Sequence, residues 1–330
     1  MIKAHKKGLK ALGIALLVSV LLIGCGNKTG DVSVKVASRD FFTIGKSACP
    51  VSIVKLVAAE NLKNNAESYG INLTSHPNLK VKKRYEQYIE NMTIDELTAV
   101  YAKALLAKSL DINLTDDEEE LMEWAAEDYY GSLDEKEVEL TDITVNELEQ
   151  YYKNYALAEK LYNNLIANVN YEVSDDEARV MHVEKLVTSD KNRAISALKE
   201  IRDGDTFASV AANYSEDGDV SITLTRGVLP EEIENVVFSL NDNGTTEILE
   251  SDGKYYVFYC VDKYDEELTE EHKKDIRAQR EYNAFTLVYD KFLESTPSAI
   301  NEEEYAKFDV SDLHEFKTSA LLEIYNKYNK

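Results

Sequence analysis

The sequence predicts a mostly helical α+β protein in which one helical domain is built from two separate stretches of chain and carries an inserted α+β domain. Its 330 residues include 4 prolines and 13 glycines, few enough to favour helices over a many-turned β fold. Apolar residues recur at spacings of three and four on both sides of the middle of the chain, the period of a helix face that packs on a partner. Between them, residues 254–262 form a strand-like run rich in aromatic and β-branched residues.

Helices are expected from about residue 47 to 170. Capping boxes mark three helix starts, because a Thr side chain and a Glu three residues later satisfy amides that a helix end leaves exposed. The boxes are Thr93 with Glu96, Thr115 with Glu118, and Thr144 with Glu147. An apolar stripe follows the last box at Leu148, Tyr151, Tyr155, Ala158, Tyr162 and Leu165. We expect this stripe to lie in a core, with a peptide-binding groove as the alternative for some of its tyrosines.

The pattern changes near residue 172. The predicted elements there are a strand at 180–187, helices at 190–203, 206–213 and 230–240, and the strand at 254–262. A second stripe then appears at Ala278, Tyr282, Phe285, Tyr289 and Phe292, followed by a final helix over about 311–328. If this late stripe packs on the early helices, the α+β stretch is an insertion in a helical domain.

The first 25 residues have the layout of a secretory signal. Four lysines and no acid precede an apolar run over 11–23, which is shorter than the roughly 20 residues that a membrane-spanning helix needs. The run ends in Leu-Ile-Gly-Cys and resembles the lipobox of bacterial lipoproteins. That resemblance implies that Cys25 is acylated and that the folded part lies outside the cytoplasm, on the outer face of the membrane of a Gram-positive cell. The alternative is a signal anchor with an incidental cysteine.

The expected boundaries follow from these patterns. They are 1–24 for the signal peptide, 25–46 for a tether and extended segment, 47–170 for the N-terminal helical domain, 172–265 for the α+β domain, and 268–330 for the C-terminal helices that pack on the N-terminal ones.

Charge excludes one class of partner. The formal net charge is −24, and removal of the four signal lysines gives −24 − 4 = −28. Such a chain is repelled by phosphates, so we expect no binding of nucleic acid. Two further cysteines, Cys49 and Cys260, are expected to be buried thiols. The histidines lack metal-site spacing and the sequence has no Gly-rich phosphate loop, so we expect neither a metal nor a cofactor.

The α+β stretch contains a series of short motifs in a fixed order. They are Ala194–Ile201, Gly204-Asp205-Thr206-Phe207-Ala208, Ala211, Tyr214-Ser215-Glu216-Asp217, Arg226-Gly227, Leu229-Pro230-Glu231, Val237-Phe238-Ser239-Leu240, Asn243-Gly244 and Gly253–Lys263. Together they resemble a parvulin-type peptidyl-prolyl isomerase domain, which 172–265 would then form. The layout of the whole chain resembles PrsA-like and SurA-like foldases.

The resemblance also implies site residues. Asp217 stands at the family's Cys/Asp position, and we predict a catalytic role for it together with His182. The prolyl pocket is predicted at Leu229, Ile233, Phe238 and Tyr256. Tyr256 replaces one family histidine. The other falls on Glu184 in one alignment of the strand, and a slipped register would offer His182 instead, since the two residues share a face. The family's glycine-rich segment is absent after Asp217.

These departures define the predicted function. We expect an extracytoplasmic, membrane-anchored foldase or chaperone for unfolded, newly exported polypeptides, whose isomerase activity is weak or lost. One alternative is a fully active parvulin-type isomerase. Another, from a different class, is a lipid-anchored solute-binding protein, which would require repeated strand–helix units.

Overall fold

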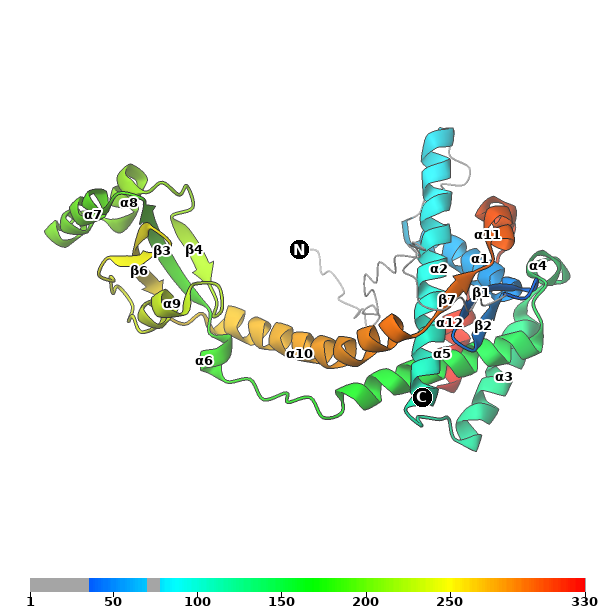
Figure 1. The fold of residues 1–330 in the computed structure, drawn as a ribbon. Coiled ribbons are helices and arrows are strands. Elements are labelled where there is room, and N and C mark those ends of the chain that lie inside the picture. Colours follow the sequence, from blue (N-terminus) through cyan, green and yellow to red (C-terminus); the bar gives the residue numbers. More distant parts are fainter. Residues whose placement is uncertain (1–35, 70–77, 330) are drawn as a thin grey trace, which may run out of the picture. The chain divides into compact units, whose positions relative to one another are not determined.

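The computed structural model describes residues 36–69 and 78–329, which form two compact units (Figure 1). The first unit combines the chain up to Ala167 with Thr286–Lys330, and the second is Asn168–Phe285. The predicted fold class, a discontinuous helical domain with an inserted α+β domain, is therefore confirmed. The predicted signal peptide and the lipidation site Cys25 lie outside the described residues.

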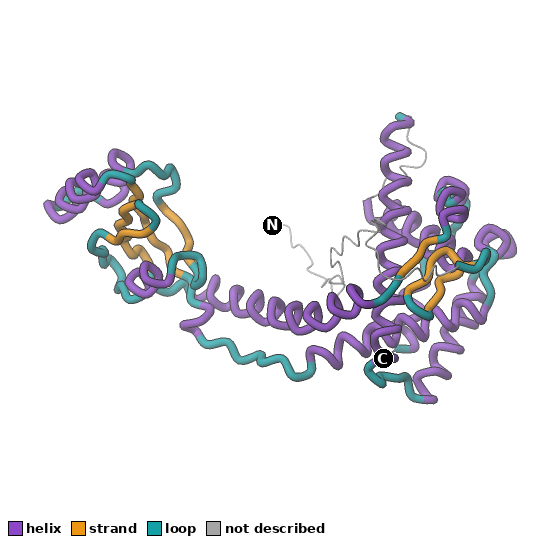
Figure 2. Tube along the Cα trace, in the orientation of Figure 1, coloured by secondary structure: helices purple, strands orange, loops and turns teal. Residues whose placement is uncertain are grey.

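Helices make up most of the first unit (Figure 2). They are α1 (Val51–Tyr69), α2 (Leu79–Ser109), α3 (Asp116–Ser132), α4 (Glu135–Thr141), α5 (Val145–Ile166), α11 (Glu302–Lys307), the 3-10 helix η2 (Val310–Leu313) and α12 (Leu321–Tyr328). Thr115 and Thr144 cap α3 and α5 as predicted, because each hydroxyl accepts the amide of the Glu three residues later, and that Glu accepts the amide of the capping residue.

The third predicted helix start, at Thr93, is wrong, because α2 runs through it. The Thr93 side chain is fully buried, and its hydroxyl accepts a hydrogen bond from Asn61 Nδ2 of α1 at 3.2 Å. Glu96 accepts a bond from the same Asn61 nitrogen at 3.0 Å. The Thr-x-x-Glu pattern here joins two helices and caps neither.

A small antiparallel sheet of order β2-β1-β7 completes this unit and was not predicted. Its strands are β1 (Asp40–Ile44), β2 (Ser47–Pro50) and β7 (Ser298–Ile300). Gly45 opens the tight β1–β2 turn with a φ of +55°, in the left-handed region that favours glycine. Strands of three to five residues are too short to show a clear period of two, so the sequence predicts only a tether and an extended segment over 25–46.

The C-terminal segment packs on the early helices through tyrosines. The rings of Tyr152 and Tyr325 stack with centroids 5.8 Å apart, and the Tyr152 hydroxyl donates to the Leu321 carbonyl at 2.8 Å. Tyr325 donates in turn to Glu159 of α5 at 2.6 Å. Tyr151, Tyr152 and Tyr325 are fully buried, which confirms that the start of the α5 stripe lies in a core.

Two buried carboxylates hold the segment before α12. Glu137 accepts the amides of Lys317 and Thr318, both at 2.8 Å. Glu60 accepts the Tyr129 hydroxyl at 2.6 Å and the Leu321 amide at 3.3 Å. Because these amides are bound by side chains, the chain is not helical between η2 and α12, and the final helix starts at residue 321 instead of the predicted 311.

The pKa values of these two carboxyls are shifted in opposite directions. Burial raises the pKa of Glu60 to about 7, against the lowering effect of the hydrogen bond from Tyr129. Burial also acts to raise the pKa of Glu137, but the hydrogen bonds from Asp134, Lys317 and Thr318 outweigh it and lower that pKa.

The second unit is an α+β domain. Its elements are α6 (Asp175–Ala178), β3 (Met181–Thr188), α7 (Lys191–Asp203), α8 (Phe207–Tyr214), β4 (Ser221–Leu224), α9 (Glu231–Phe238), β5 (Leu249–Ser251), β6 (Lys254–Asp262) and the first part of α10 (Glu266–Ser295). The strands form an antiparallel sheet of order β4-β3-β6-β5. The strands predicted at 180–187 and 254–262 are its two central members, β3 and β6.

The first half of α10 belongs to this unit through its cations. Lys273 and Arg280 form ion pairs with Asp175 and Glu177 of α6. Arg277 Nε donates to the Tyr171 carbonyl at 3.0 Å. The predicted boundary at 268 differs from the observed one at Phe285, because the apolar stripe of α10 is evident in the sequence and these polar contacts are not.

The opposite pKa shifts generate a stability prediction. Folding raises the pKa of Glu60 to about 7, so the folded protein binds this proton more tightly than the unfolded chain does. The contribution of Glu60 is therefore complete below the unfolded pKa of about 4.3 and is lost as the pH rises through the folded value. Glu60→Gln keeps an acceptor oxygen and cannot ionise. Between about pH 5 and about pH 8 we expect the wild type to lose about 2 kcal/mol of unfolding free energy relative to this variant, measured by urea titration.

Glu137→Gln is the matched control. The lowered pKa of Glu137 means that its stabilisation is present above the unfolded pKa and is lost as the pH falls. The loss of unfolding free energy in Glu137→Gln relative to wild type should therefore be larger at about pH 8 than in acid, the opposite trend to Glu60→Gln. Parallel pH curves for wild type and Glu60→Gln would contradict the assignment.

Candidate functional site

The sheet of the second unit has two differently covered faces. Val183 of β3 and Phe258 and Cys260 of β6 pack with α9 on one face, here called the α9 face. Leu186 and Val257 point to the other face and pack with α7 and α8. Successive residues of a strand point to opposite faces, so each predicted site residue can be assigned to one of them.

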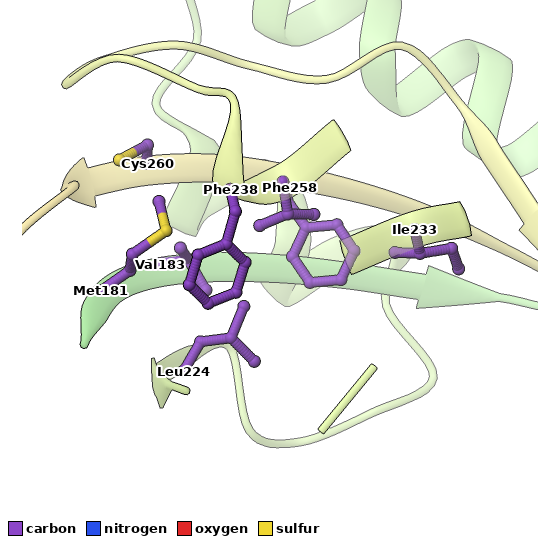
Figure 3. Packing of buried hydrophobic residues seen from close by; sticks show 8 residues of the cluster. Met181, Val183, Leu224, Ile233, Phe238, Phe258 and Cys260 are labelled. Carbon is purple, nitrogen blue, oxygen red and sulfur yellow. The ribbon is translucent and has the colours of Figure 1, made fainter. Parts of the chain in front are cut away.

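All four predicted prolyl-pocket residues lie on the α9 face. Ile233 and Phe238 of α9 belong to the buried cluster, at 3% and 4% exposure, and Leu229 and Tyr256 are half-buried against it. Figure 3 shows the rings of Phe238 and Phe258 and the side chain of Ile233 gathered over the strands. The structure thus brings these four predicted residues together.

The α9 face is closed by the protein's own side chains. Two guanidinium groups lie over the Phe238 ring, Arg226 at 4.5 Å and Arg179 at 5.0 Å from its centroid. Arg226 is held there because its Nη2 donates to both carboxylate oxygens of Asp176, and Arg179 donates to the Phe238 carbonyl at 2.8 Å. An isomerase needs an open apolar socket for the proline ring, whereas the predicted pocket residue Phe238 is covered by two cations.

Asp217 follows α8 and forms an ion pair with Lys185 Nζ at 2.7 Å. Lys185 is two residues beyond Val183 on β3 and therefore points to the α9 face, opposite Phe258 in the register. The hydrogen bond from Lys185, and then the one from the Asp219 amide, lower the pKa of Asp217. Asp217 is thus an acceptor-only carboxylate at neutral pH.

Lys185 is a site residue that sequence reasoning missed. The signal that would have found it is the alternation of β3, since Met181, Val183 and Lys185 occupy one face and only the last is charged.

His182 does not join this site. It alternates with Val183, so it points away from the α9 face, and its Nε2 is 2.7 Å from Asp265 Oδ2. Glu184, which aligns with the family histidine, points to the same side as His182. The predicted partnership of His182 with Asp217 is therefore not found, because the family alignment fixes a position along the strand and the pleat decides the face.

The first unit contains a separate surface hollow of about 160 Å³. It lies among α3, α5 and the residue after α12, and it is lined by Leu114, Glu118, Leu121, Met122, Ala156, Glu159, Lys160, Asn163 and Asn329. Lys160 and Glu118 form an ion pair at 2.6 Å at its edge. Apolar side chains with a few charged groups around them suit the binding of a side chain from a peptide.

Cys49 and Cys260 are free, fully buried thiols, as predicted. Among residues 36–69 and 78–329, no three His, Cys, Asp or Glu side chains gather closely enough to hold a metal ion. Within the same residues, no helix combines the length and the apolar character needed to cross a membrane.

A known family model overlaps the second unit. Residues 143–273 match the family model of the PPIC-type PPIASE domain. The foldase protein PrsA of Halalkalibacterium halodurans is 23% identical over 255 residues, which span 70% of this chain and 75% of the relative.

Solved PrsA structures align over much of the chain. The peptidylprolyl isomerase PrsA from Bacillus cereus shares 17% identity with a TM-score of 0.36, covering 75% of this chain and 92% of that one. The foldase PrsA from Lactococcus lactis shares 16% identity with a TM-score of 0.32, covering 85% and 100%. The match to the PPIC-type domain model covers most of the second unit, and over 70% of its length the chain is similar to a PrsA foldase.

Proposed function

We propose that this protein is a membrane-anchored, extracytoplasmic foldase that binds unfolded, newly exported polypeptides and has weak or no prolyl isomerase activity. The observation that carries the loss of activity is the α9 face, where Phe238 is covered by Arg179 and Arg226. Asp217 is neutralised by Lys185, and neither strand histidine position of the family offers an imidazole to this face. The likeness to PrsA foldases supports the chaperone role, and the lipobox at Cys25 supports the anchor.

Rotation about an X-Pro bond has to overcome a barrier of about 18–20 kcal/mol, and an isomerase lowers it by favouring the twisted amide over the planar one. A proline ring could enter the socket only after a side chain of the α9 face moved. Displacement of Arg226 would break its hydrogen bonds to Asp176, and displacement of Arg179 would break its bond to the Phe238 carbonyl, which adds to the cost of binding.

The hollow in the first unit supports client binding. Leu121 and Met122 of α3 and Ala156 of α5 supply apolar surface, while Lys160 and Glu118 supply polar groups at the rim. A site of this size accepts one side chain at a time, which suits weak and sequence-tolerant contact with an unfolded chain.

Isomerase activity can be measured by NMR exchange of a short X-Pro peptide with residues 26–330. We expect exchange to be as slow as without the protein, with a time constant on the order of tens to hundreds of seconds, because the socket is closed. Acceleration that falls severalfold in Asp217→Asn but not in Asp205→Asn, an exposed acid of the same unit, would instead establish the fully active parvulin. His182→Ala should leave either result unchanged, since His182 points away from the α9 face.

Chaperone activity can be measured as suppression of aggregation of an unfolded client. We expect wild-type suppression near stoichiometric amounts, and a severalfold higher protein requirement for Leu121→Ser, because the hollow loses apolar contact worth roughly 1–2 kcal/mol. Leu110→Ser is the matched control, since Leu110 is 44% exposed, lies in the same unit and is outside the hollow. No suppression by wild type would contradict the foldase role, and equal losses in both variants would exclude the hollow as the client site.

A further inference from the structure

The first turns of α2 are basic in an otherwise acidic protein. Four of the five residues 80–84 are Lys or Arg, whereas the chain as a whole carries a net charge of −24. The segment Leu79–Tyr88, here called the basic tip, includes one acid, Glu86, and so has a net charge of +3. Figure 1 shows this end of α2 projecting past the other labelled helices of its unit.

Most of the charge of the basic tip faces solvent. The buried residues of α2 begin at Ile89, one position after the tip ends. Lys82 pairs with Glu86 at 3.4 Å. The described residues place no carboxylate within ion-pair distance of the three exposed cations, Lys80, Lys83 and Arg84.

Apolar side chains are exposed on the same segment. Leu79 is 78% exposed, Tyr88 is 54% exposed and Val81 is 38% exposed. Leu79 stands at the very start of the helix, next to Lys80. Cations interleaved with exposed aliphatic and aromatic side chains on a helix are typical of elements that lie at a membrane interface.

We propose that the basic tip docks on the anionic headgroup surface of a phospholipid membrane. Lipid phosphates complement the three exposed cations, and Leu79 and Val81 can enter the boundary between headgroups and acyl chains. A polyanion without an apolar phase would satisfy the cations but not these two side chains. The acidic remainder of the chain is repelled by the same surface, which favours contact through the tip alone.

The length of the chain before the first described residue is compatible with docking of the basic tip on the membrane that holds the lipid anchor. This step of the argument rests on the proposed anchor at Cys25. Phe42 of β1 lies beside Tyr101 of α2, with ring centroids 5.6 Å apart. Tyr101 is 22 positions from Leu79, which at 1.5 Å per residue is about 33 Å along the helix. The ten residues 26–35 can span up to roughly 33–36 Å.

The test is co-sedimentation of residues 26–330, without acylation, with vesicles of phosphatidylglycerol mixed with phosphatidylcholine and with vesicles of phosphatidylcholine alone. We expect binding to the anionic vesicles at about 0.05 M salt, and its loss at about 0.5 M, where screening is strong. In the triple variant Lys80→Gln, Lys83→Gln and Arg84→Gln the partition coefficient should fall on the order of 100-fold, since each cation near such a surface contributes roughly fivefold.

The matched control is the triple variant Arg39→Gln, Lys46→Gln and Lys108→Gln. It removes the same charge from three exposed and dispersed positions of the same unit, and should change binding little. Glutamine has a helix propensity close to that of lysine, and circular dichroism checks that both variants keep their helices.

Equal losses in the two triple variants would overturn the proposal, as would equal binding to neutral vesicles or none to anionic ones. Because the protein used here lacks the acylated cysteine and no client is present, these outcomes do not depend on the lipid anchor or on chaperone activity.

Discussion

The first unit depends on one constraint: the C-terminal segment has to pack on helices that lie more than 150 positions earlier in the sequence. Glu137 meets this constraint at one end by binding the amides of Lys317 and Thr318, and Tyr325 meets it at the other by donating to Glu159. A buried carboxylate can hold successive amides that no strand or helix partner satisfies, and an unpaired buried amide would cost on the order of 1–3 kcal/mol. The stacked tyrosines of α5 and α12 add apolar area between these polar ends.

On the α9 face, too, charged side chains are bound by partners within the same unit. Arg226 is oriented by Asp176 and lies on Phe238, and Asp217 is occupied by Lys185. Each contact ties a charged group of this face to a partner within the same unit. The α9 face therefore packs as part of the core of its own domain.

Much of the fold could be predicted from sequence, because long apolar stripes and capping boxes are local signals. Thr115 and Thr144 lie at real helix ends, and the strand-like run at 254–262 is β6. What could not be predicted depends on partners distant in sequence: Thr93 is taken up by Asn61, and the short strands of the β2-β1-β7 sheet carry no periodic signal. For the candidate site, motif order predicted four side chains that do lie together on the α9 face. The face on which His182 lies, and the presence of Lys185 beside Asp217, follow from strand pleating and pairing.

The β1–β7 pairing bears on the order in which the chain acquires its structure. The side-chain amide of Asn301, just past β7, donates to the carbonyl of Asp40, 261 positions earlier. The N-terminal part of the chain emerges first, so β1 and β2 have no third strand to pair with until nearly the whole polypeptide is free to fold. The inserted domain pairs β3 with β4 and β6 within 82 positions, since it spans Met181–Asp262, and closing shorter loops costs less entropy. The second unit can therefore fold while the first unit still lacks its C-terminal strand. During that stage the protein is itself an incompletely folded polypeptide.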